Sequence, residues 1–211
     1  ARSRTVTQEL NIGGQVGPVT AVVGAFYMRD SAFDQLHYDF PLGIFPLPAG
    51  SSLDHLSMRT MTKSKAVFGD ATWNLTDRAR IVAGIRFSED KITQTQRTLL
   101  SFGPTPPFAS CPLRTNDVTY KSTTPKIGAQ FDVSDDSNVY ATYSKGFKSG
   151  GWNLYACDNG FEPEKVTSYE AGWKNRLLDN TLIVNASVFY YDYTDLQLSQ
   201  VVGLVRLIKN A

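Results

Sequence analysis

The sequence predicts an all-β fold, an antiparallel up-and-down transmembrane β-barrel segment of about eight strands. Three observations support this prediction: apolar and polar residues alternate with a period of two, short turns alternate with long loops, and aromatic residues gather at both ends of the apolar files. A period of two is typical of strands whose two faces meet different environments. No apolar run reaches the roughly 18 residues of a membrane helix, and barrel strands would not produce one.

Eight segments carry the alternating pattern. In one of them, Ile81, Ala83, Ile85 and Phe87 alternate with polar or small residues. A tilted strand crosses a membrane in roughly 9–11 residues, so we expect each segment to span it once. The segments are 6–12, 19–28, 65–74, 81–88, 126–133, 139–147, 168–174 and 182–190.

The connections between these segments are of two kinds, and the two kinds alternate strictly. Short turns rich in Gly, Asp, Asn and Ser occupy 13–18, 75–79, 134–137 and 178–180. Long connections rich in Pro and Gly occupy 29–62, 90–120 and 149–165. All short turns should therefore lie at one end of the sheet, as the periplasmic turns of outer-membrane barrels do, opposite long extracellular loops.

Aromatic residues of the apolar files fall into two groups. Those beside the short turns are Trp73, Phe131 and Trp173, and those near the long loops are Tyr27, Phe87, Tyr143 and Tyr190. Mostly Val, Ile, Leu, Ala and Gly lie between the groups. This arrangement predicts two girdles of lipid-interface aromatics around an apolar band. Large rings that cap the ends of a soluble β-core are the alternative.

The opposite files are too polar for a dry core. We expect the following residues to face the lumen: Arg86, Lys126, Gln130, Glu170 and Lys174. Each buried polar group left unpaired would cost about 1–3 kcal/mol, which a wet lumen or a polar plug would avoid.

Composition limits the classes of molecule that the chain is expected to bind. A net charge of +1 provides no basic excess, so no nucleic-acid partner is expected. The N-terminal residues ARSRTVTQEL lack the features of a signal peptide and are interpreted as residues within a strand.

Cys111 and Cys157 fall in neighbouring long loops on one side of the sheet, where a disulfide could join them; whether they come within bonding geometry is left open.

No catalytic centre, cofactor site or metal site is predicted. His37 and His55 are the only histidines, and both fall in one long loop with several aspartates. Their spacing matches no known ligand pattern, so we interpret them as solvated. The GFKSGG stretch lacks the residue order of a phosphate-binding loop.

Residues 138–197 resemble TonB-dependent outer-membrane receptors. NVYATYSKGFKSGGWN resembles a family strand that ends in a Tyr-Ser-Lys-Gly-Phe run before an extracellular loop. FEPEKVTSYEAGWKNRLLDNTLIVNASVFYYDYTDLQ resembles the family's Pro-Glu-x-x-x-x-Tyr-Glu-x-Gly-x-Lys strand, its tight turn and the following strand. Upstream, SRTVTQEL, VVGAFYMRD and VFGDATWNLTDRARIVAGIRFSEDK also fit, so the resemblance covers nearly the whole chain.

The resemblance implies a 22-stranded barrel blocked by an N-terminal plug. Residues 1–211 would be part of that barrel domain, with the plug domain and the remaining strands absent. The implied function is TonB-dependent active transport of a bulky, scarce nutrient, above all a ferric siderophore, across the outer membrane of a Gram-negative bacterium. The implied partners are outer-membrane lipid, the plug of the full-length protein, the inner-membrane TonB complex and the bulky ligand.

Aromatic rings in the long loops are the expected ligand contacts, because exposed rings stack on sugars, catecholates and corrins. These residues are Tyr38, Phe40, Phe45, Phe102, Phe108, Trp152, Tyr155 and Phe161. Packing of the loops against one another is an equally good explanation of these rings.

Three other functions stay open on the residues alone. A passive porin would lack a plug. A barrel enzyme would need a Ser/His or Asp/His constellation near the strand ends. A soluble carbohydrate-binding β-sandwich would bury the apolar file against a second sheet. An open sheet would leave two unpaired edges in lipid, so residues 1–211 are not expected to insert alone.

Overall fold

The computed structural model describes residues 2–40, 48–101, 108–153, 160–179, 181–202 and 205–211; within these ranges it leaves out the side chains of residues 36, 38, 40, 53–58, 100, 108–110, 202 and 205–206. Every regular element among the described residues is a β-strand. The strands are β1 (Arg2–Val16), β2 (Val19–Phe40), β3 (Ser51–Asn74), β4 (Ala79–Ser101), β5 (Phe108–Ser134), β6 (Ser137–Lys148), β7 (Gly151–Trp152), β8 (Gly160–Phe161), β9 (Glu164–Leu177), β10 (Leu182–Thr194), β11 (Gln197–Val202) and β12 (Val205–Asn210). Within the described ranges, no helix is both long and apolar enough to cross a membrane.

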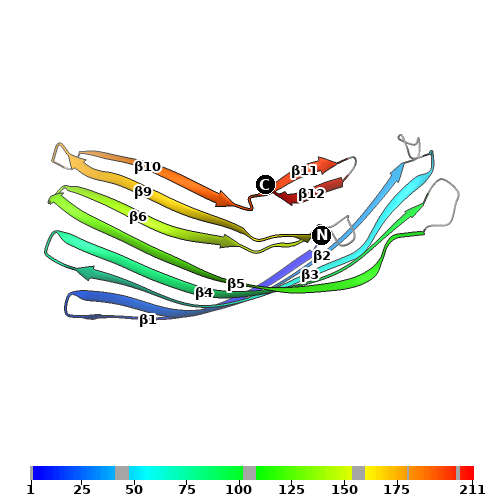
Figure 1. The fold of residues 1–211 in the computed structure, drawn as a ribbon, viewed down its shortest axis with the longest axis horizontal. Coiled ribbons are helices and arrows are strands. Elements are labelled where there is room, and N and C mark those ends of the chain that lie inside the picture. The colour runs from blue at the N-terminus through cyan, green and yellow to red at the C-terminus, as the bar shows by residue number, and fades with distance from the viewer. Residues whose placement is uncertain (1, 41–47, 102–107, 154–159, 180, 203–204) are drawn as a thin grey trace.

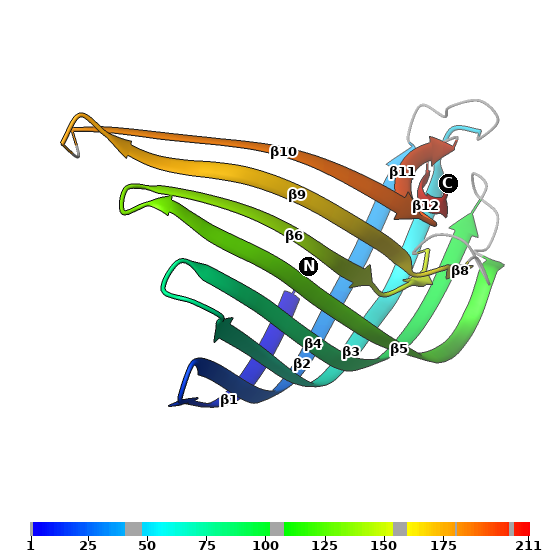
Figure 2. The ribbon, with the colours of Figure 1, turned by 60° about the vertical axis from the view of Figure 1, so that its left-hand side comes forward.

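Eight of the strands form one antiparallel sheet in the order β1-β2-β3-β4-β5-β6-β9-β10. Within this sheet each strand pairs with the next strand along the chain, with one exception: β6 pairs with β9, because the intervening β7 and β8 form a separate two-stranded sheet. The sheet is curved, with β1 and β10 at its two edges, and the β11–β12 hairpin lies beside its upper part (Figures 1 and 2). These strands confirm the predicted all-β, antiparallel, up-and-down barrel segment.

Four tight connections lie at one end of the sheet, as expected (Figure 1). The first is shorter than predicted, because β1 and β2 stay paired up to Val16 and Val19. Only Gly17 and Pro18 remain in the turn, and Gly17 adopts φ 55°, a conformation that glycine reaches without steric cost. Leu178 and Asp179 take the same left-handed conformation in the turn between β9 and β10.

Two of the three predicted long loops are mainly strand, which corrects the sequence prediction. The β2–β3 pairing runs out to Phe40 and Ser51, and the β4–β5 pairing runs out to Leu100 and Phe108. These strands are therefore 22 to 27 residues long instead of the roughly 9–11 needed to cross a membrane. Residues 92–98, ITQTQRT, illustrate why the sequence prediction took these segments for loops. Their alternating Thr residues favour a strand, but the segment is too polar for a lipid-facing wall.

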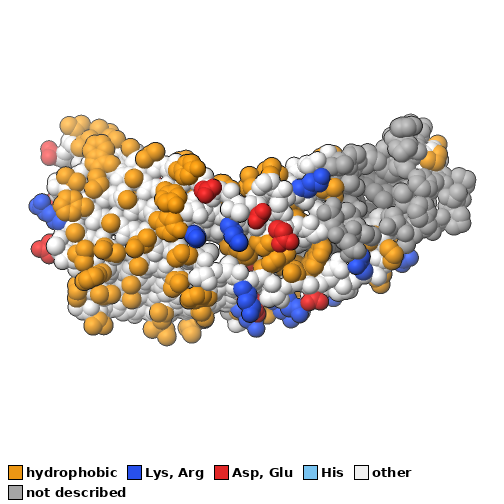
Figure 3. Space-filling model, viewed as in Figure 1, with side chains coloured by type: hydrophobic (Ala, Val, Ile, Leu, Met, Phe, Trp, Pro, Cys, Tyr) orange, Lys and Arg blue, Asp and Glu red, His pale blue; other side chains and the backbone are white. Residues whose placement is uncertain are grey.

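The apolar residues of the eight strands form one continuous surface, which we call the apolar face. One row across the whole sheet consists of Val16, Val19, Trp73, Ile81, Ala129, Ala141, Ala171 and Val188. Ile85 and Ile127 on this face are 41% and 54% exposed. Figure 3 shows hydrophobic side chains gathered on the part of the sheet nearest the short turns, with charged side chains farther along. Among the described residues no second layer covers this surface, so the second sheet that a β-sandwich would need is not part of the described structure.

Candidate functional site

The apolar face carries the predicted aromatic girdles. Trp73, Phe131 and Trp173 lie toward the short turns and are 44–49% exposed. The indole N–H of Trp173 donates to Ser137 Oγ over 2.9 Å, so the polar end of this ring points to the rim of the sheet. At the other end, Phe87 is 49% exposed. Tyr27 lies one row beyond Phe87 on the same face.

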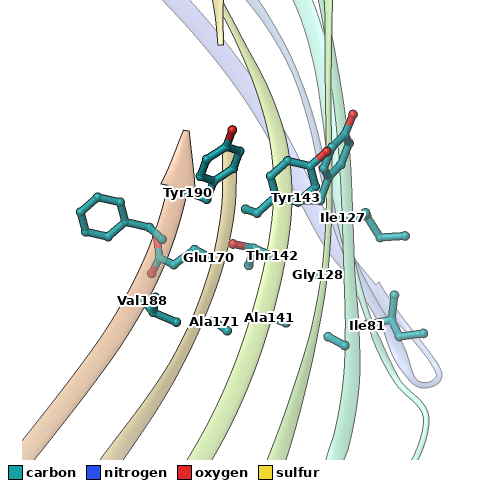
Figure 4. Close-up of a pocket in the computed structure, with 13 residues that line it drawn as sticks. Ile81, Ile127, Gly128, Ala141, Thr142, Tyr143, Glu170, Ala171, Val188 and Tyr190 are labelled. Atoms are coloured by element: carbon teal, nitrogen blue, oxygen red, sulfur yellow. The ribbon is translucent and has the colours of Figure 1, made fainter. Parts of the chain in front are cut away.

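The second girdle continues across β6, β9 and β10. The ring centroids of Tyr143 and Tyr169 are 5.3 Å apart, and those of Tyr169 and Tyr190 are 6.4 Å apart. Below these tyrosines is an open groove of about 640 Å³ with alanines on its floor, between Ile127 and Val188 (Figure 4). A shallow apolar groove between large rings suits contact with acyl chains.

The opposite surface, which we call the polar face, carries all five residues predicted to face the lumen. Arg86, Lys126 and Gln130 come from β4 and β5, and Glu170 and Lys174 come from β9. The strand registers place them on one side of the sheet. On β3 and β4 the residues on this side are mostly less exposed than those on the apolar face, as expected for the inside of a curved wall, whereas on the edge strands β1 and β10 both faces are exposed.

Charged groups on the polar face are paired across strands. The Arg80 guanidinium donates to both carboxylate oxygens of Asp132, at 2.5 and 2.7 Å, and Asn138 donates to the same carboxylate at 2.7 Å. Lys126 lies 3.6 Å from Asp70. Such charge-assisted cross-strand pairs fix side-chain positions while leaving the surface hydrated.

A second group on the polar face is built around a glycine. The hydroxyl of Tyr140 donates to Glu170 over 2.5 Å, and the Lys174 ammonium lies 5.2 Å from the centre of the Tyr140 ring. A Cβ atom at Gly172 would come within 2.4 Å of that ring. The ring therefore lies flat over Gly172 because this position has no side chain. Arg86 makes similar cation–π contacts with Phe26 and Phe68, at 5.2 and 5.6 Å.

The sequence interpretation missed an aromatic ladder on the polar face of β10, formed by Phe189, Tyr191 and Tyr193. The first two rings stack with centroids 5.0 Å apart, and the last two meet edge to face at 6.3 Å. Their alternation with Val188 and Tyr190, which lie on the apolar face, is the signal that could have revealed them. All three rings are 44–60% exposed, so this surface is open to a ligand or to another part of the protein.

Beyond the apolar band, the chain after β6 is held against the polar face. Asp90 accepts hydrogen bonds from Ser64 of β3 and from Ser149, which directly follows β6. Gly150 is buried, and a Cβ atom there would collide with the Phe161 carbonyl and the Tyr120 hydroxyl. Burial, followed by the negative charge of Glu162, raises the pKa of Tyr120, so its hydroxyl stays protonated.

Three amide side chains join this segment to the β11–β12 hairpin. Asn153, which is 2% exposed, donates to the Ile208 carbonyl and accepts from the Ile208 N–H. Asn210 makes the same two-way contact with the backbone of Glu162. The amide of Gln197 donates to the carbonyls of Ser149 and Glu162. We call the described parts of 149–162 together with β11–β12 the cap.

One buried polar side chain of β4 makes no hydrogen bond within the described structure. Gln96 is 1% exposed, and neither atom of its amide has a hydrogen-bond partner among the described residues. Leaving such atoms unpaired costs about 1–3 kcal/mol each, so a water molecule or a polar ligand atom is expected beside them.

The aromatic residues predicted as ligand contacts are only partly described. Trp152 and Phe161 are half-buried and pack against Gly160 and Gly151 of the β7–β8 pair. The side chains of Tyr38, Phe40 and Phe108, and the whole of Phe45, Phe102 and Tyr155, lie outside the described residues. The role of these rings in ligand contact stays a prediction.

The cysteine and histidine predictions are also only partly described. Cys111 is 3% exposed and disulfide-bonded, and Cys157 lies outside the described residues, so the predicted pairing stays a prediction. His37 lies 3.0 Å from Asp39, and the His55 side chain is not described. The described residues contain no group of three or more potential metal ligands.

The chain is similar to a family of outer-membrane proteins. The sequence profile described as "TonB dependent receptor-like, beta-barrel" matches residues 2–207. The pesticin receptor of Yersinia enterocolitica is 31% identical over 192 residues, which is 88% of this chain and 26% of that receptor. The ferric-pyoverdine 358 receptor of Pseudomonas putida is 27% identical over 60% of the chain and 14% of its own length.

Solved structures show the same fold. The ferric yersiniabactin uptake receptor of Yersinia pestis superposes with a TM-score of 0.76 at 25% identity, covering 93% of this chain and 29% of that receptor. A copper transporter superposes with a TM-score of 0.71 at 16% identity, covering 99% of this chain and 33% of its own. The chain thus spans about a quarter of the length of the curated relatives it matches most extensively.

Proposed function

This chain belongs to the TonB-dependent receptor-like β-barrel family, a family of Gram-negative outer-membrane receptors, and we propose that it forms part of the wall and extracellular surface of an active transporter. The cargo we propose is a bulky, scarce nutrient, above all a ferric siderophore. Energy would come from the inner-membrane TonB complex, acting on a plug domain within the full-length protein. These steps fit a family of receptors and transporters rather than enzymes.

One observation carries the proposal: a continuous, exposed apolar face lies opposite a polar face with cross-strand charge pairs on the same eight strands. Such a sheet suits lipid on the first side and a plugged, water-containing lumen on the second. Strands β1 and β10 have one unpaired edge each in the described sheet, and unpaired backbone groups are costly in lipid. We therefore propose that further strands of the same barrel continue from both edges.

The aromatic ladder and the cap support the cargo class. Exposed tyrosine and phenylalanine rings offer flat stacking surfaces together with hydroxyl groups, which suits bulky chelates that contain aromatic rings. Two similar receptors carry the words ferric pyoverdine and ferric yersiniabactin in their names. We propose that the cargo passes between the ladder of Phe189, Tyr191 and Tyr193 and the cap before it reaches the plug.

Uptake by the full-length protein tests this function. The protein would be expressed in cells that lack other siderophore receptors, and accumulation of radioactive iron would be measured with ferric yersiniabactin and ferric pyoverdine as probes. We expect accumulation of at least one probe in cells with TonB and none without it. Equal uptake in both strains would indicate a passive porin, and no uptake of any ferric chelate would refute the proposed cargo class.

Substitutions in the ladder test its role in this transport. Tyr191→Ala removes the central ring, and each aromatic pair contributes about 0.5–1.5 kcal/mol, so we expect the half-saturating concentration of chelate to rise about 2-fold to 13-fold. Ser187→Ala is the control, because Ser187 lies on the same face of β10 but outside the ladder. Equal half-saturating concentrations for both variants would show that the ladder does not contact the cargo.

A further inference from the structure

The sheet divides toward its long-loop end, between β5 and β6. Pairing of these two strands reaches Lys126 and Ser144, and the next residue of β5, Pro125, has no backbone N–H to continue the ladder. Beyond this point β5 stays paired with β4, and β6 stays paired with β9. An open cavity of about 280 Å³ lies here, lined by residues of the polar face on one side and by residues of β6 on the other.

Arg86 of β4 brings an uncompensated positive charge into this cavity. Its Nε donates to Ser88 Oγ over 3.1 Å, and its guanidinium lies over the rings of Phe26 and Phe68. Its two terminal nitrogens have neither a hydrogen-bond acceptor nor a carboxylate partner among the described residues. The two rings keep water from part of this half-buried cation, and a partly desolvated charge without a counter-charge is costly.

Two hydroxyl groups face Arg86 across the β4–β5 ladder. Thr124 lies directly opposite Arg86, and Ser122 lies directly opposite Ser88. Directly opposed side chains stand about 5 Å apart, so one anion can contact groups from both strands. The hydroxyls of Ser122 and Thr124 make no hydrogen bond within the described part of the chain. The cavity therefore offers a planar guanidinium and two hydroxyl donors, which together suit the two oxygens of a carboxylate.

The charges around the cavity favour an anion beside Arg86. Asp90, the acidic residue that lines the cavity, lies four residues from Arg86, which is about 13 Å of strand. Both oxygens of its carboxylate already accept hydrogen bonds from serines. Lys145 of β6 is a second cation at the border, whereas Lys65, which also borders the cavity, is directed to the apolar face by its register.

We propose that this cavity binds a carboxylate group of the cargo, held by the terminal nitrogens of Arg86 and by the hydroxyls of Ser122 and Thr124. The proposal rests on the proposed function, because it takes the polar face to line the path of the cargo. It narrows the cargo to chelates with a carboxylate that is free of the metal. The cap begins at Ser149, which is hydrogen-bonded to Asp90 of the same cavity, so the site lies where the cargo would pass the cap.

Anion binding by the purified full-length protein in detergent tests this proposal without iron. Isothermal titration calorimetry at low ionic strength would compare tricarballylate, a compact tricarboxylate, with its uncharged triamide. We expect the wild type to bind tricarballylate in preference to the triamide. A hydrogen bond to a charged group changes affinity by roughly 10-fold to 150-fold, so Arg86→Gln should weaken tricarballylate binding by at least about 10-fold.

Two further variants separate the cavity from net charge. Ser122→Ala with Thr124→Ala keeps the charge of the protein and should weaken tricarballylate binding by at least about 5-fold, since each neutral hydrogen bond changes affinity about 2-fold or more. Arg78→Gln removes one positive charge from the exposed turn between β3 and β4 and should bind tricarballylate as the wild type does.

Three outcomes would overturn the proposal: equal binding of the two probes by the wild type, undiminished tricarballylate binding in either cavity variant, or an equal loss in the Arg78 variant. The proposed cargo is tested separately, because the calorimetric measurement contains no iron. A protein that binds tricarballylate but imports no ferric chelate would refute the cargo class alone, and a protein that imports a ferric chelate but fails the calorimetric test would refute the carboxylate site alone.

Discussion

Ile127→Lys tests the assignment of the apolar face to lipid. Ile127 is 54% exposed on β5, four residues from Phe131 of the girdle beside the short turns. Four residues of strand span roughly 13 Å, which at the usual barrel tilt is about 10 Å along the membrane normal. The apolar band of such barrels is about 25 Å tall, so Ile127 lies close to its middle.

A lysine at the middle of the band is expected to lower the free energy of unfolding by about 2–4 kcal/mol, which is about 30-fold to 900-fold in the folding equilibrium. The matched control is Thr142→Lys on the adjacent strand β6. Thr142 is half-buried on the polar face and lies opposite Glu170, so a lysine there gains a charged neighbour and water. Urea unfolding of the full-length protein in lipid vesicles, followed by fluorescence, measures both variants.

The comparison of the two variants decides the result. A cost below about 1 kcal/mol for Ile127→Lys would show that this surface does not lie in hydrocarbon. Equal costs for both lysines would show that the two faces meet the same environment, and the division into an apolar and a polar face would then have no functional meaning.

Two further predictions concern packing and covalent structure. Gly172→Ala should lower the free energy of unfolding by about 1–3 kcal/mol, because the added Cβ would displace the Tyr140 ring. The control is Gly69→Ala, whose Cβ would meet only ordinary van der Waals contacts and which should cost less than half as much. Urea unfolding measures both variants, and equal costs would refute the argument. A disulfide between Cys111 and Cys157 should make the protein from the outer membrane 2 Da lighter than its reduced form in a non-reducing mass measurement, and two alkylatable thiols at these positions would contradict it.

Most of the wall could be predicted from the sequence because its two faces meet different solvents. Alternation of Ile81, Ala83 and Ile85 with polar or small residues identifies a strand and also its lipid-facing side. The tight connections could be located from their Gly, Asp and Asn content. Their exact length could not, because pairing of Val16 with Val19 depends on cross-strand hydrogen bonds that turn composition does not record.

The extended ribbons could not be predicted by the same reasoning. Above the membrane both faces of β4 and β5 are polar, so the contrast that marks a membrane strand disappears while the backbone pairing continues. Residues such as Thr93 and Thr95 favour strands, but this preference depends on context and does not by itself identify a paired strand. Only the register between β4 and β5 shows that these residues stay paired.

The candidate site was predicted where it depends on charge and missed where it depends on which face a ring occupies. Arg86 and Glu170 could be assigned to the polar face because charge is excluded from lipid. Phe189 and Tyr191 could not be assigned by type, since aromatic rings suit both a girdle and a lumen. Their alternation with Val188 and Tyr190 was the available signal, and the register of β10 against β9 places them on the polar face.

The position of Asp90 on β4 shows what orders the chain beyond the apolar band. The apolar band ends at Phe87, yet Asp90 and Lys91 still lie on opposite faces, with Asp90 hydrogen-bonded to Ser64 and Ser149 and Lys91 directed outward. Hydrocarbon cannot cause this separation, because both residues lie beyond it. An anionic layer outside the wall does not explain it either, because the acidic Glu89 lies on the same outer face as Lys91. The hydrogen bonds from Ser64 and Ser149 do explain it, since they hold the Asp90 carboxylate on the polar face beside the cap. The first polar rows of the ribbons are therefore ordered by contacts with the cap, although the hydropathy of their residues resembles that of a soluble loop.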